Sequence, residues 1–479
     1  MAVNVFSASV PLEVARAGLD RVRADHEVDL GFPDEVIAEA QAAIAAYVPP
    51  ALDMTDLEFV TLDPASSMDL DQAFFIERAD TGFRVRYAIA DVPAFVAVGG
   101  AIDAETRRRG ETVYCPDLKA SLHPPALADD AASLLPDQVR GAYVWSFDVD
   151  PAGEATFAGL QRATIRSRAK LGYEQEQERF DAGSPHPQVA LLREVGILRQ
   201  QQEVARGAVS LPNLSQEVGS DGEGGFTLKY RVSVPIEDWN AQLSLMTGMA
   251  AARIMLDGGI GILRTMPAAD ERDLRRVRAS ARALGIRWPN EMPYPELIRS
   301  LDATNPQHAA FLDNVTLLLR GAGYTAFDGA RPELTTHSAI AAEYAHTTAP
   351  LRRLVDRFVL SVCLALVEGR EIDPAIREAL PQVPDLMTAA IRRSRAVQRE
   401  SMDFLEAALL AGREGVAFRG VVIEQRREDG IVQLADPAIT ARVRGTDLPV
   451  GEWVEAWLVV ADPVARRVVF DVTPRSKRT

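Results

Sequence analysis

The first part of the chain carries apolar residues at helical spacing. Two such stretches cover 11–23 and 33–47, are rich in Ala, Glu, Leu and Val, and end before Pro49-Pro50. Residues 1–50 hold three Arg against eight acidic residues, so the two helices lack the basic recognition face of a helix-turn-helix. We predict a helical segment over residues 1–50 that packs on the rest of the chain or guides a substrate toward it.

After Glu58 the apolar positions alternate with a period of two, which is typical of strands. The predicted strands are 58–63, 72–78, 83–92, 143–149 and 154–163. Helical spacing then returns over 190–209, 236–256, 270–284, 305–322 and 350–411. Early antiparallel strands followed by helices favour an α+β fold with a mixed antiparallel sheet.

The last part of the chain returns to short strands. Gly412-Arg413-Glu414-Gly415 breaks the final helix, and residues 416–472 then alternate β-branched runs with Asp-Gly, Asp-Pro and Pro-Val-Gly turns. That length fits a barrel of about five strands, the size of an OB fold. We therefore expect three parts: a helical segment over 1–50, an α+β domain over 51–411 and an OB-type β-barrel over 416–474.

Composition places the chain among soluble globular proteins. It has 479 residues, of which 47% are hydrophobic and 25% charged, enough for roughly two to four domains. The two cysteines, Cys115 and Cys363, exclude a disulfide scaffold and a Cys-rich zinc module, and suit a reducing compartment. No apolar run reaches the roughly 18 residues of a membrane span, and the first residues do not resemble a signal peptide. We expect a cytoplasmic monomer without membrane contact.

The charge balance restricts how a nucleic acid could bind. The chain holds 52 Lys and Arg against 68 Asp and Glu, a net charge of −16, which repels polyanions at long range. Residues 416–479 hold ten basic and nine acidic residues, so the carboxyl end is the least acidic part. A polyanionic partner would need a local basic channel.

Three carboxylates crowd the segment between the first two predicted strands. Asp63, Asp69 and Asp71 lie in TLDPASSMDLDQAF, residues 61–74. Asp69 and Asp71 project to the same side if the chain is extended there, and Asp63 can reach back from the strand end. Clustered carboxylates repel one another unless a cation neutralises them, and oxygen ligands suit Mg²⁺ or Mn²⁺. The alternative is a turn with capping Asp residues, whereas an EF-hand fits worse because its Gly and distal Glu are absent.

A second candidate site lies in HSAIAAEYAHTTAPLRR, residues 337–353. Pro350 is predicted to start a helix, which puts Arg352 and Arg353 in its first turn. The helix dipole disfavours cations there, so a tandem Arg indicates a bound anion such as phosphate. The alternative is a structural salt bridge to an acid such as Asp356.

Aromatic and basic residues provide weaker signals. Tyr114 in GETVYCPD and Tyr173 in RSRAKLGYEQ each lie beside basic residues, a composition that stacks bases of single-stranded nucleic acid, although a lone Tyr is more often half-buried packing. A stripe of arginines ends at Glu400, and such a stripe is commonly a solvated face. Its members are Arg392, Arg393, Arg395 and Arg399.

Several segments together resemble the ribonuclease II family, also called the RNB family, of hydrolytic 3′-to-5′ exoribonucleases. The resemblance covers about residues 55–411 and the OB-type RNA-binding domain at the carboxyl end. Beyond the Asp loop it rests on four segments: AIADVPAFV (88–96), ALADDAASLLP (126–136), ATIRSRAKLGY (163–173) and YAHTTAPLRRLVD (344–356). Several matches in the right order are more specific than any one of them.

The resemblance implies roles for single residues. Asp63, Asp69 and Asp71 would be the metal and catalytic carboxylates for Mg²⁺ or Mn²⁺, and Arg352 would steady the scissile phosphate. The residues implied to contact the RNA substrate are Tyr114, Tyr173, Glu400, Arg353 and Gln72. Hydrolysis of single-stranded RNA from the 3′ end to nucleoside 5′-monophosphates is the implied activity.

Two departures from the family pattern leave a competing interpretation open. Gln72 stands where the family usually has a fourth Asp, a neutral ligand that would weaken one metal position. Ala241-Gln242 stands where the family usually has a pair of Glu. A non-catalytic RNA-binding protein of the same fold is the alternative that Gln72 favours. A phosphodiesterase acting on a small nucleotide is disfavoured by the carboxyl-terminal barrel.

Overall fold

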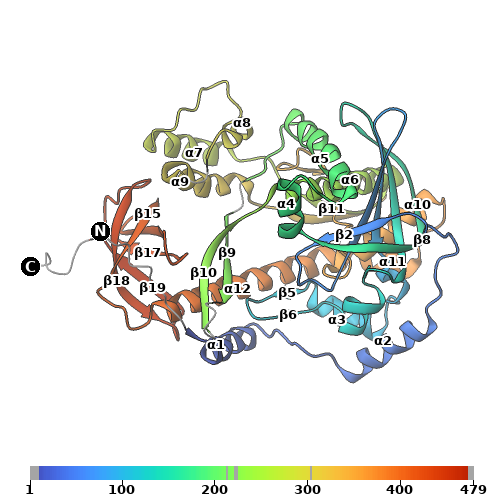
Figure 1. The fold of residues 1–479 in the computed structure, drawn as a ribbon, viewed down its shortest axis with the longest axis horizontal. Helices are drawn as coiled ribbons and strands as arrows, with labels where there is room; N and C mark the ends of the chain where they lie inside the picture. The colour runs from blue at the N-terminus through green and yellow to red at the C-terminus, as the bar shows by residue number, and fades with distance from the viewer. Residues whose placement is uncertain (1–9, 212–213, 221–224, 303–304, 473–479) are drawn as a thin grey trace, which may run out of the picture.

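The structure is a computed structural model of this chain and describes residues 10–211, 214–220, 225–302 and 305–472. Its largest sheet is a closed five-stranded barrel in the order β2-β3-β4-β7-β8. The strands β2 and β8 of this barrel lie on the right in Figure 1. The strands are β2 (Phe59–Asp63), β3 (Gln72–Arg78), β4 (Phe83–Ala90), β7 (Val139–Val149) and β8 (Ala155–Gly172). The strands predicted between residues 58 and 163 are confirmed. The long β8 pairs with β7 and then, in parallel, with β2, which closes the barrel.

Helices cover this barrel and share its apolar core. They are α4 (Tyr173–Asp181), α5 (Pro187–Ala205), α6 (Pro235–Gly258) and α10 (Leu354–Val367). Tyr87, Trp145 and Phe147 of the strands pack in one buried cluster with Phe358 of α10. The mixture of strands and helices confirms the α+β prediction. None of the described helices combines the length and apolar character that a bilayer span requires.

A second group of elements packs against the barrel near the Asp loop. It consists of α2 (Asp34–Ala46), α3 (Ala101–Arg109), the short ribbon β5 (Val113–Tyr114) and β6 (Lys119–Ala120), and the π-helical turn η2 (Leu127–Ala131). Val36 of α2, Ile102 of α3 and Leu127 of η2 belong to one cluster with Leu70 of the loop. Only α2 was predicted from the sequence, because the other elements are too short to show a period.

The region predicted as one helix over 350–411 is divided. The helix begins at Leu354, not at Pro350, and Gly369 in the left-handed region (φ +64°) ends it. The chain continues through α11 (Pro374–Ala379), the 3₁₀ turn η4 (Leu380–Gln382) and α12 (Val383–Leu410). The helix predicted over 305–322 is α9 (Pro306–Val315) followed by the 3₁₀ turn η3 (Thr316–Leu319).

Three strand pairs were not predicted between residues 190 and 350, of which the shortest is β13 (Thr336–His337) with β14 (Ala342–Glu343). The other two are longer. They are β9 (Leu214–Ser220) with β10 (Gly225–Val232), and β11 (Ile260–Thr265) with β12 (Gly323–Asp328). The helices α7 (Glu271–Ala283) and α8 (Tyr294–Arg299) lie between β11 and β12 in sequence.

The carboxyl end forms the expected small barrel. Its strands are β15 (Ala417–Gln425), β16 (Asp429–Leu434), β17 (Thr440–Arg444), β18 (Trp453–Asp462) and β19 (Arg467–Asp471), closed in the order β15-β16-β17-β19-β18. The long α12 runs from α11 to this barrel (Figure 1). Phe404 of α12, Phe226 of β10 and Leu19 of α1 (Leu12–Asp25) share one apolar cluster with the barrel. The barrel is therefore packed against the rest of the chain.

Glu406 of α12 is a buried carboxyl at this junction. It is 4% exposed and accepts hydrogen bonds from Gln216 Nε2 (2.7 Å) and the Thr440 backbone N–H (3.1 Å). Burial raises its pKa to about 7, and the two hydrogen bonds oppose that rise. The carboxyl thus links α12, the β9–β10 hairpin and the small barrel.

We expect Glu406→Gln to gain stability relative to the wild type as pH rises. A carboxyl with a raised folded pKa contributes stability below its unfolded pKa near 4.5 and loses it as pH rises through about 7. The difference in unfolding free energy between variant and wild type should shift by about 2 kcal/mol between pH 4.5 and 8, measured by denaturant unfolding. Glu414→Gln, at an exposed position, is the control. If the stability difference between Glu406→Gln and the wild type does not change with pH, the pKa of Glu406 is not raised.

Candidate active site

The Asp loop between β2 and β3 is fixed by backbone and hydroxyl contacts. The Ser133 hydroxyl accepts from the Leu70 backbone N–H (3.0 Å) and donates to the Met68 carbonyl (2.6 Å). The Leu134 N–H donates to the Leu70 carbonyl (3.0 Å). Segment 126–136, one of the motifs that the sequence singled out, therefore holds the loop that carries the carboxylates.

Asp71 joins this loop to the segment before α10. Its side chain is buried, and Oδ1 accepts from the Leu351 backbone N–H at 2.7 Å, across 280 sequence positions. Its Oδ2 lies 3.4 Å from Arg352 Nε. Burial raises the pKa of Asp71 well above its usual value, whereas Arg352 and the Leu351 N–H oppose the rise. The structure thus brings the Asp loop and the Arg352 segment, two candidate sites far apart in sequence, into contact.

Asp63 lies at the end of β2, opposite Gly172 of β8. Burial raises its pKa to about 6; Arg352 lowers it and Asp69 raises it. Arg352 therefore acts on two carboxyls, Asp63 and Asp71, while its own side chain remains 44% exposed. An exposed guanidinium beside the buried Asp71 and the partly buried Asp63 can reach an anion on the open side of the site.

Asp69 has both carboxylate oxygens engaged by the β5–β6 ribbon. Lys119 Nζ lies 2.7 Å from Oδ1, and the Tyr114 hydroxyl donates to Oδ2 at 3.2 Å. Tyr114 and Lys119 are cross-strand partners in the ribbon. Lys119 Nζ also lies 2.7 Å from Asp129 Oδ1 in η2. Sequence reasoning missed Lys119 and Asp129, although both lie in or beside motifs that it quoted.

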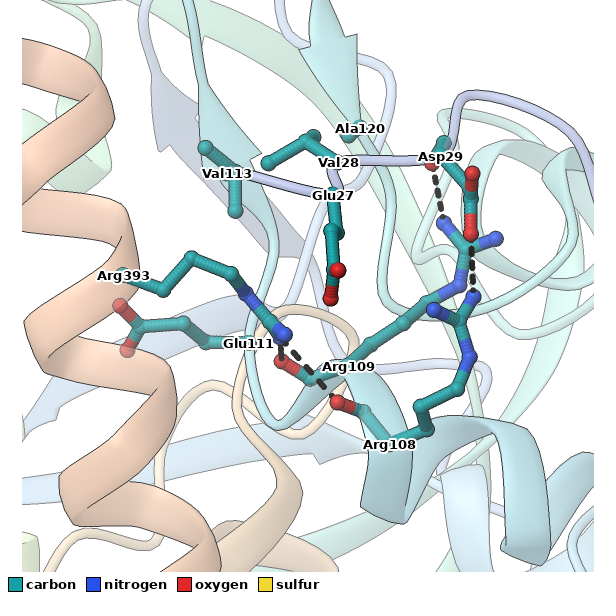
Figure 2. Close-up of a pocket in the computed structure, with 9 residues that line it drawn as sticks. All are labelled: Glu27, Val28, Asp29, Arg108, Arg109, Glu111, Val113, Ala120 and Arg393. Carbon is teal, nitrogen blue, oxygen red and sulfur yellow. Dashed lines mark hydrogen bonds and ion pairs between the residues drawn. The ribbon is translucent and has the colours of Figure 1, made fainter. Parts of the chain in front are cut away.

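A network of arginine contacts lies beside the ribbon (Figure 2). A pocket there has a volume of about 20 Å³, room for one water molecule. Arg393 on α12 donates to the carbonyls of Arg108 (3.1 Å) and Arg109, and Arg108 pairs with the Asp29 carboxylate at 3.0 Å. This pocket is too small for a substrate. Its contacts join α3 to α12 and to the chain at Asp29, and Val113 and Ala120 of the ribbon line it.

The two tyrosines lie on different sides of the carboxylates. Tyr114 is 42% exposed and reaches Asp69 through its hydroxyl. Tyr173 directly follows Gly172, and its hydroxyl accepts from Asn240 Nδ2 at 2.9 Å. Burial raises the pKa of Tyr173, and the nearby charge of Asp63 adds to that rise. Tyr114 therefore lies beside Asp69 and Tyr173 near Asp63, and their contact with a substrate stays a prediction.

Gln72 is held by contacts that an aspartate could not make in full. Its amide Nε2 donates to the Thr348 carbonyl, and its Oε1 accepts from the Tyr87 hydroxyl at 3.3 Å. The Tyr87 hydroxyl also contacts Ser244 Oγ at 2.9 Å. A carboxylate at position 72 would point an acceptor at the Thr348 carbonyl, which costs energy in a buried setting. Gln72 thus ties β3 to segment 347–353.

The expectation of two arginines in the first turn of a helix is wrong. Both precede Leu354, because the Arg352 and Arg353 N–H groups close a turn onto the Ala349 carbonyl (3.2 and 2.9 Å). Arg353 pairs with Asp356 through Nε (3.0 Å) and a second nitrogen (2.9 Å). The structural salt bridge is therefore the observed state of Arg353, whereas Arg352 faces the carboxylates.

Glu400 lies away from the Asp loop. Its carboxylate pairs with Arg466 of the small barrel and lies 3.1 Å from His26 Nε2. Arg466 also pairs with Asp25 at the end of α1. Glu400 therefore links α12, the amino-terminal segment and the small barrel, and the structure does not bring it to the carboxylates.

The donor chemistry fits a divalent cation only in part. Asp71 is buried and Asp63 partly buried, and their raised pKa values reflect the cost of their negative charge, which a cation would relieve. In the part of the chain that the structure describes, no group of three or more His, Cys, Asp or Glu is arranged to hold a metal ion. The arrangement differs from the expected three-carboxylate site because Lys119 and Tyr114 occupy Asp69.

Part of the arginine stripe on α12 lines a larger pocket of about 410 Å³. Arg392, Arg395 and Arg399 line it together with Arg264 of β11. Burial lowers the pKa of Arg264, and the charges of Arg395 and Arg353 lower it further. Among the described residues, neither Arg392 nor Arg395 has an ion pair with an acid. A pocket of this kind attracts anions.

Residues 51–368 match the RNB domain family, and residues 417–473 match the RNase II-type exonuclease C-terminal S1 domain. Ribonuclease R of Mycoplasma pneumoniae is 26% identical over 438 residues, which cover 84% of this chain and 58% of that protein. Exoribonuclease 2 of Enterobacter sp. (strain 638) is 28% identical over 415 residues, which cover 81% of this chain and 62% of that protein. The chain thus spans less than two thirds of the length of these curated relatives.

Solved structures share the fold. The apo form of Mycoplasma genitalium RNase R has a TM-score of 0.84 at 21% identity, covering 96% of this chain and 78% of that chain. Yeast Ssd1, described as a pseudonuclease, has a TM-score of 0.67 at 15% identity, covering 94% of this chain and 57% of that chain. The match of residues 51–368 covers well over half of the sequence and includes the Asp loop and the Arg352 segment. The resemblance drawn from the motifs is confirmed, and the chain belongs to the RNB family.

Proposed function

We propose that this chain is a divalent-metal-dependent exoribonuclease that hydrolyses single-stranded RNA from its 3′ end to nucleoside 5′-monophosphates. The observation that carries the proposal is the contact of Asp71 with both Leu351 N–H and Arg352, which joins two distant motifs at one exposed guanidinium. The names of the relatives, Ribonuclease R and Exoribonuclease 2, support RNA as the substrate class. A solved complex of Mycoplasma genitalium RNase R with ribose-methylated single-stranded RNA supports it further.

Each residue of the site has its own role in this proposal. Asp63 and Asp71 would hold Mg²⁺ or Mn²⁺, which supplies an activated water and neutralises developing charge. Arg352 binds the scissile phosphate, because its guanidinium is part exposed and held by one long contact to Asp71. The exposed ring of Tyr114 stacks on the terminal base while its hydroxyl is fixed by Asp69. Tyr173 lies on the Asp63 side, near the 3′ nucleotide.

A second candidate function is RNA binding without hydrolysis. Gln72 in place of a fourth carboxylate and Lys119 against Asp69 both reduce the negative charge available to a metal. The fold is also similar to that of yeast Ssd1, described as a pseudonuclease.

The product ladder of a 5′-labelled single-stranded RNA separates the two candidates. With Mg²⁺ or Mn²⁺ we expect the labelled RNA to become shorter one nucleotide at a time, with release of nucleoside 5′-monophosphates. EDTA should stop the reaction. RNA that is bound but never shortened at any divalent-ion concentration would favour the non-catalytic candidate.

The arginine pocket on α12 is proposed to hold the RNA backbone outside the carboxylate site. We expect the double variant Arg392→Ala, Arg395→Ala to bind RNA about tenfold more weakly. Because two phosphate contacts are lost, the plot of log affinity against log salt concentration should be less steep by about 1.4. Turnover at saturating RNA should be unchanged. Fluorescence anisotropy over a salt series measures both quantities.

The matched control for the arginine pocket is Arg253→Ala with Arg370→Ala. Both control residues are exposed and pair with an acid nearby in sequence, Asp257 and Glu368. Equal salt slopes for the pocket variant and the wild type would show that the pocket does not hold RNA.

A further inference from the structure

Lys119 occupies the position of a cation among the carboxylates. Its ammonium lies 2.7 Å from Asp69 Oδ1 and 2.7 Å from Asp129 Oδ1, so it bridges the Asp loop and η2. The second oxygen of Asp69 is taken by the Tyr114 hydroxyl. The Asp69 side chain is 8% exposed, so little water competes for these contacts. Each oxygen of Asp69 already accepts one hydrogen bond, and the Lys119 ammonium beside Oδ1 would repel a second cation at this carboxylate.

A lysine suits this bridge between two carboxylates better than an arginine. The chain contains only four lysines, at positions 119, 170, 229 and 477, within a total of 52 Lys and Arg. Arginine thus serves nearly every other cationic position. An ammonium is a compact charge with three donors that can bridge two carboxylates from different elements, whereas the planar guanidinium favours one bidentate partner.

The charges of the site indicate how many divalent cations it needs. Asp63, Asp69, Asp71 and Asp129 bring four negative charges, and Lys119 and Arg352 return two positive charges. Among the groups in direct contact a charge of −2 remains, which one divalent cation would neutralise. Lys170, whose charge also lowers the pKa of Asp63, donates to the Ala65 carbonyl at 2.8 Å. Gln72 is neutral, whereas a carboxylate at this position would add a further negative charge for cations to balance.

We propose that the Lys119 ammonium is a built-in counter-cation of the Asp loop, so that the site takes one divalent cation, at Asp63 and Asp71, and not two. This inference rests on the proposed function for its metal. Lys119 is a positioning residue here: it holds Asp69, and through Asp69 the hydroxyl of Tyr114. Removing its charge frees Asp69 and Asp129 as ligands for a second cation.

Mn²⁺ binding to the folded chain without RNA tests this inference, measured by titration calorimetry and by the electron paramagnetic resonance of free Mn²⁺. We expect one Mn²⁺ per wild-type chain, two per chain for Lys119→Met and Lys119→Gln, and one for Lys119→Arg, which keeps the charge. Asp71→Asn should reduce the wild-type number to none. Lys229→Met, at an exposed position on β10, is the matched control and should bind one.

The Mn²⁺ titration can succeed or fail independently of the RNA hydrolysis assay. A wild type that binds two Mn²⁺, or Lys119→Met and Lys119→Gln variants that fold and bind no more Mn²⁺ than the wild type, would overturn the inference. A wild type that binds one Mn²⁺ and gains a second on loss of the Lys119 charge supports it even if RNA is never shortened, in which case only the proposed function fails. Thermal unfolding of each variant establishes that it is folded.

Discussion

Asp71→Asn is expected to lower the rate of RNA hydrolysis by on the order of 10³-fold or more while leaving the fold and RNA binding intact. The side chain keeps its volume, and the amide oxygen can still accept from the Leu351 N–H that now bonds Asp71 Oδ1. What is lost is the negative charge that faces Arg352 and would hold the metal. Single-turnover hydrolysis and RNA affinity, measured on the same preparation, separate these effects.

The stability of the Asp71 variant provides a second readout. Burial raises the pKa of Asp71, so its ionised form is costly in the folded state. Asp71→Asn removes that cost and should unfold at the same temperature as the wild type or higher. Asp130→Asn is the matched control, because Asp130 is 71% exposed and pairs with Arg140 on the outside of the same segment. Wild-type hydrolysis by Asp71→Asn would show that this loop is not the active site.

Arg352→Ala is expected to lower kcat by about 10²-fold to 10³-fold, with a smaller change in KM, because the guanidinium is proposed to stabilise charge that develops on the phosphate. Arg352→Lys should recover part of the loss, since an ammonium keeps the charge but not the fork of donors. Steady-state kinetics on a short RNA measure both constants. Arg168→Ala is the control, because that exposed guanidinium bonds only the Thr55 carbonyl among the described contacts.

The pH profile distinguishes this role from a structural one. Arg352 lowers the pKa of both Asp63 and Asp71, so its loss should raise both values further. The acid limb of the residual activity of Arg352→Ala should move to higher pH, whereas Arg352→Lys should stay near the wild type. An unchanged acid limb and an unchanged kcat in Arg352→Ala would remove Arg352 from the mechanism.

Local patterns were sufficient to locate the candidate site. The Asp loop could be found because its three carboxylates are close in sequence, and the Arg352 segment because its motif is contiguous. The five early strands and the carboxyl-terminal barrel could be predicted because alternation with a period of two reports a half-buried strand directly. Membership in the RNB family followed from several such segments in order.

The start of α10 was misplaced for a physical reason. Apolar spacing continues through Leu351, and proline favours a first helical turn, so the pattern alone puts the beginning at Pro350. In the structure, Leu351 N–H bonds Asp71 and the Arg353 backbone bridges Glu111, so these groups are not available to a helix. Partners far away in sequence therefore decided the helix boundary.

The sequence by itself determined the fold class, the family and which segments carry the chemistry, because burial period and contiguous motifs are local properties. Only the tertiary structure decided how those segments meet: β8 closing the barrel onto β2, Gln72 bonding the Thr348 carbonyl, and Lys119 taking Asp69. Lys119 and Asp69 are 50 positions apart in sequence, and Gln72 and Thr348 are 276 apart. A local pattern reports which face of a segment is buried, whereas the identity of the partner depends on how the whole chain packs.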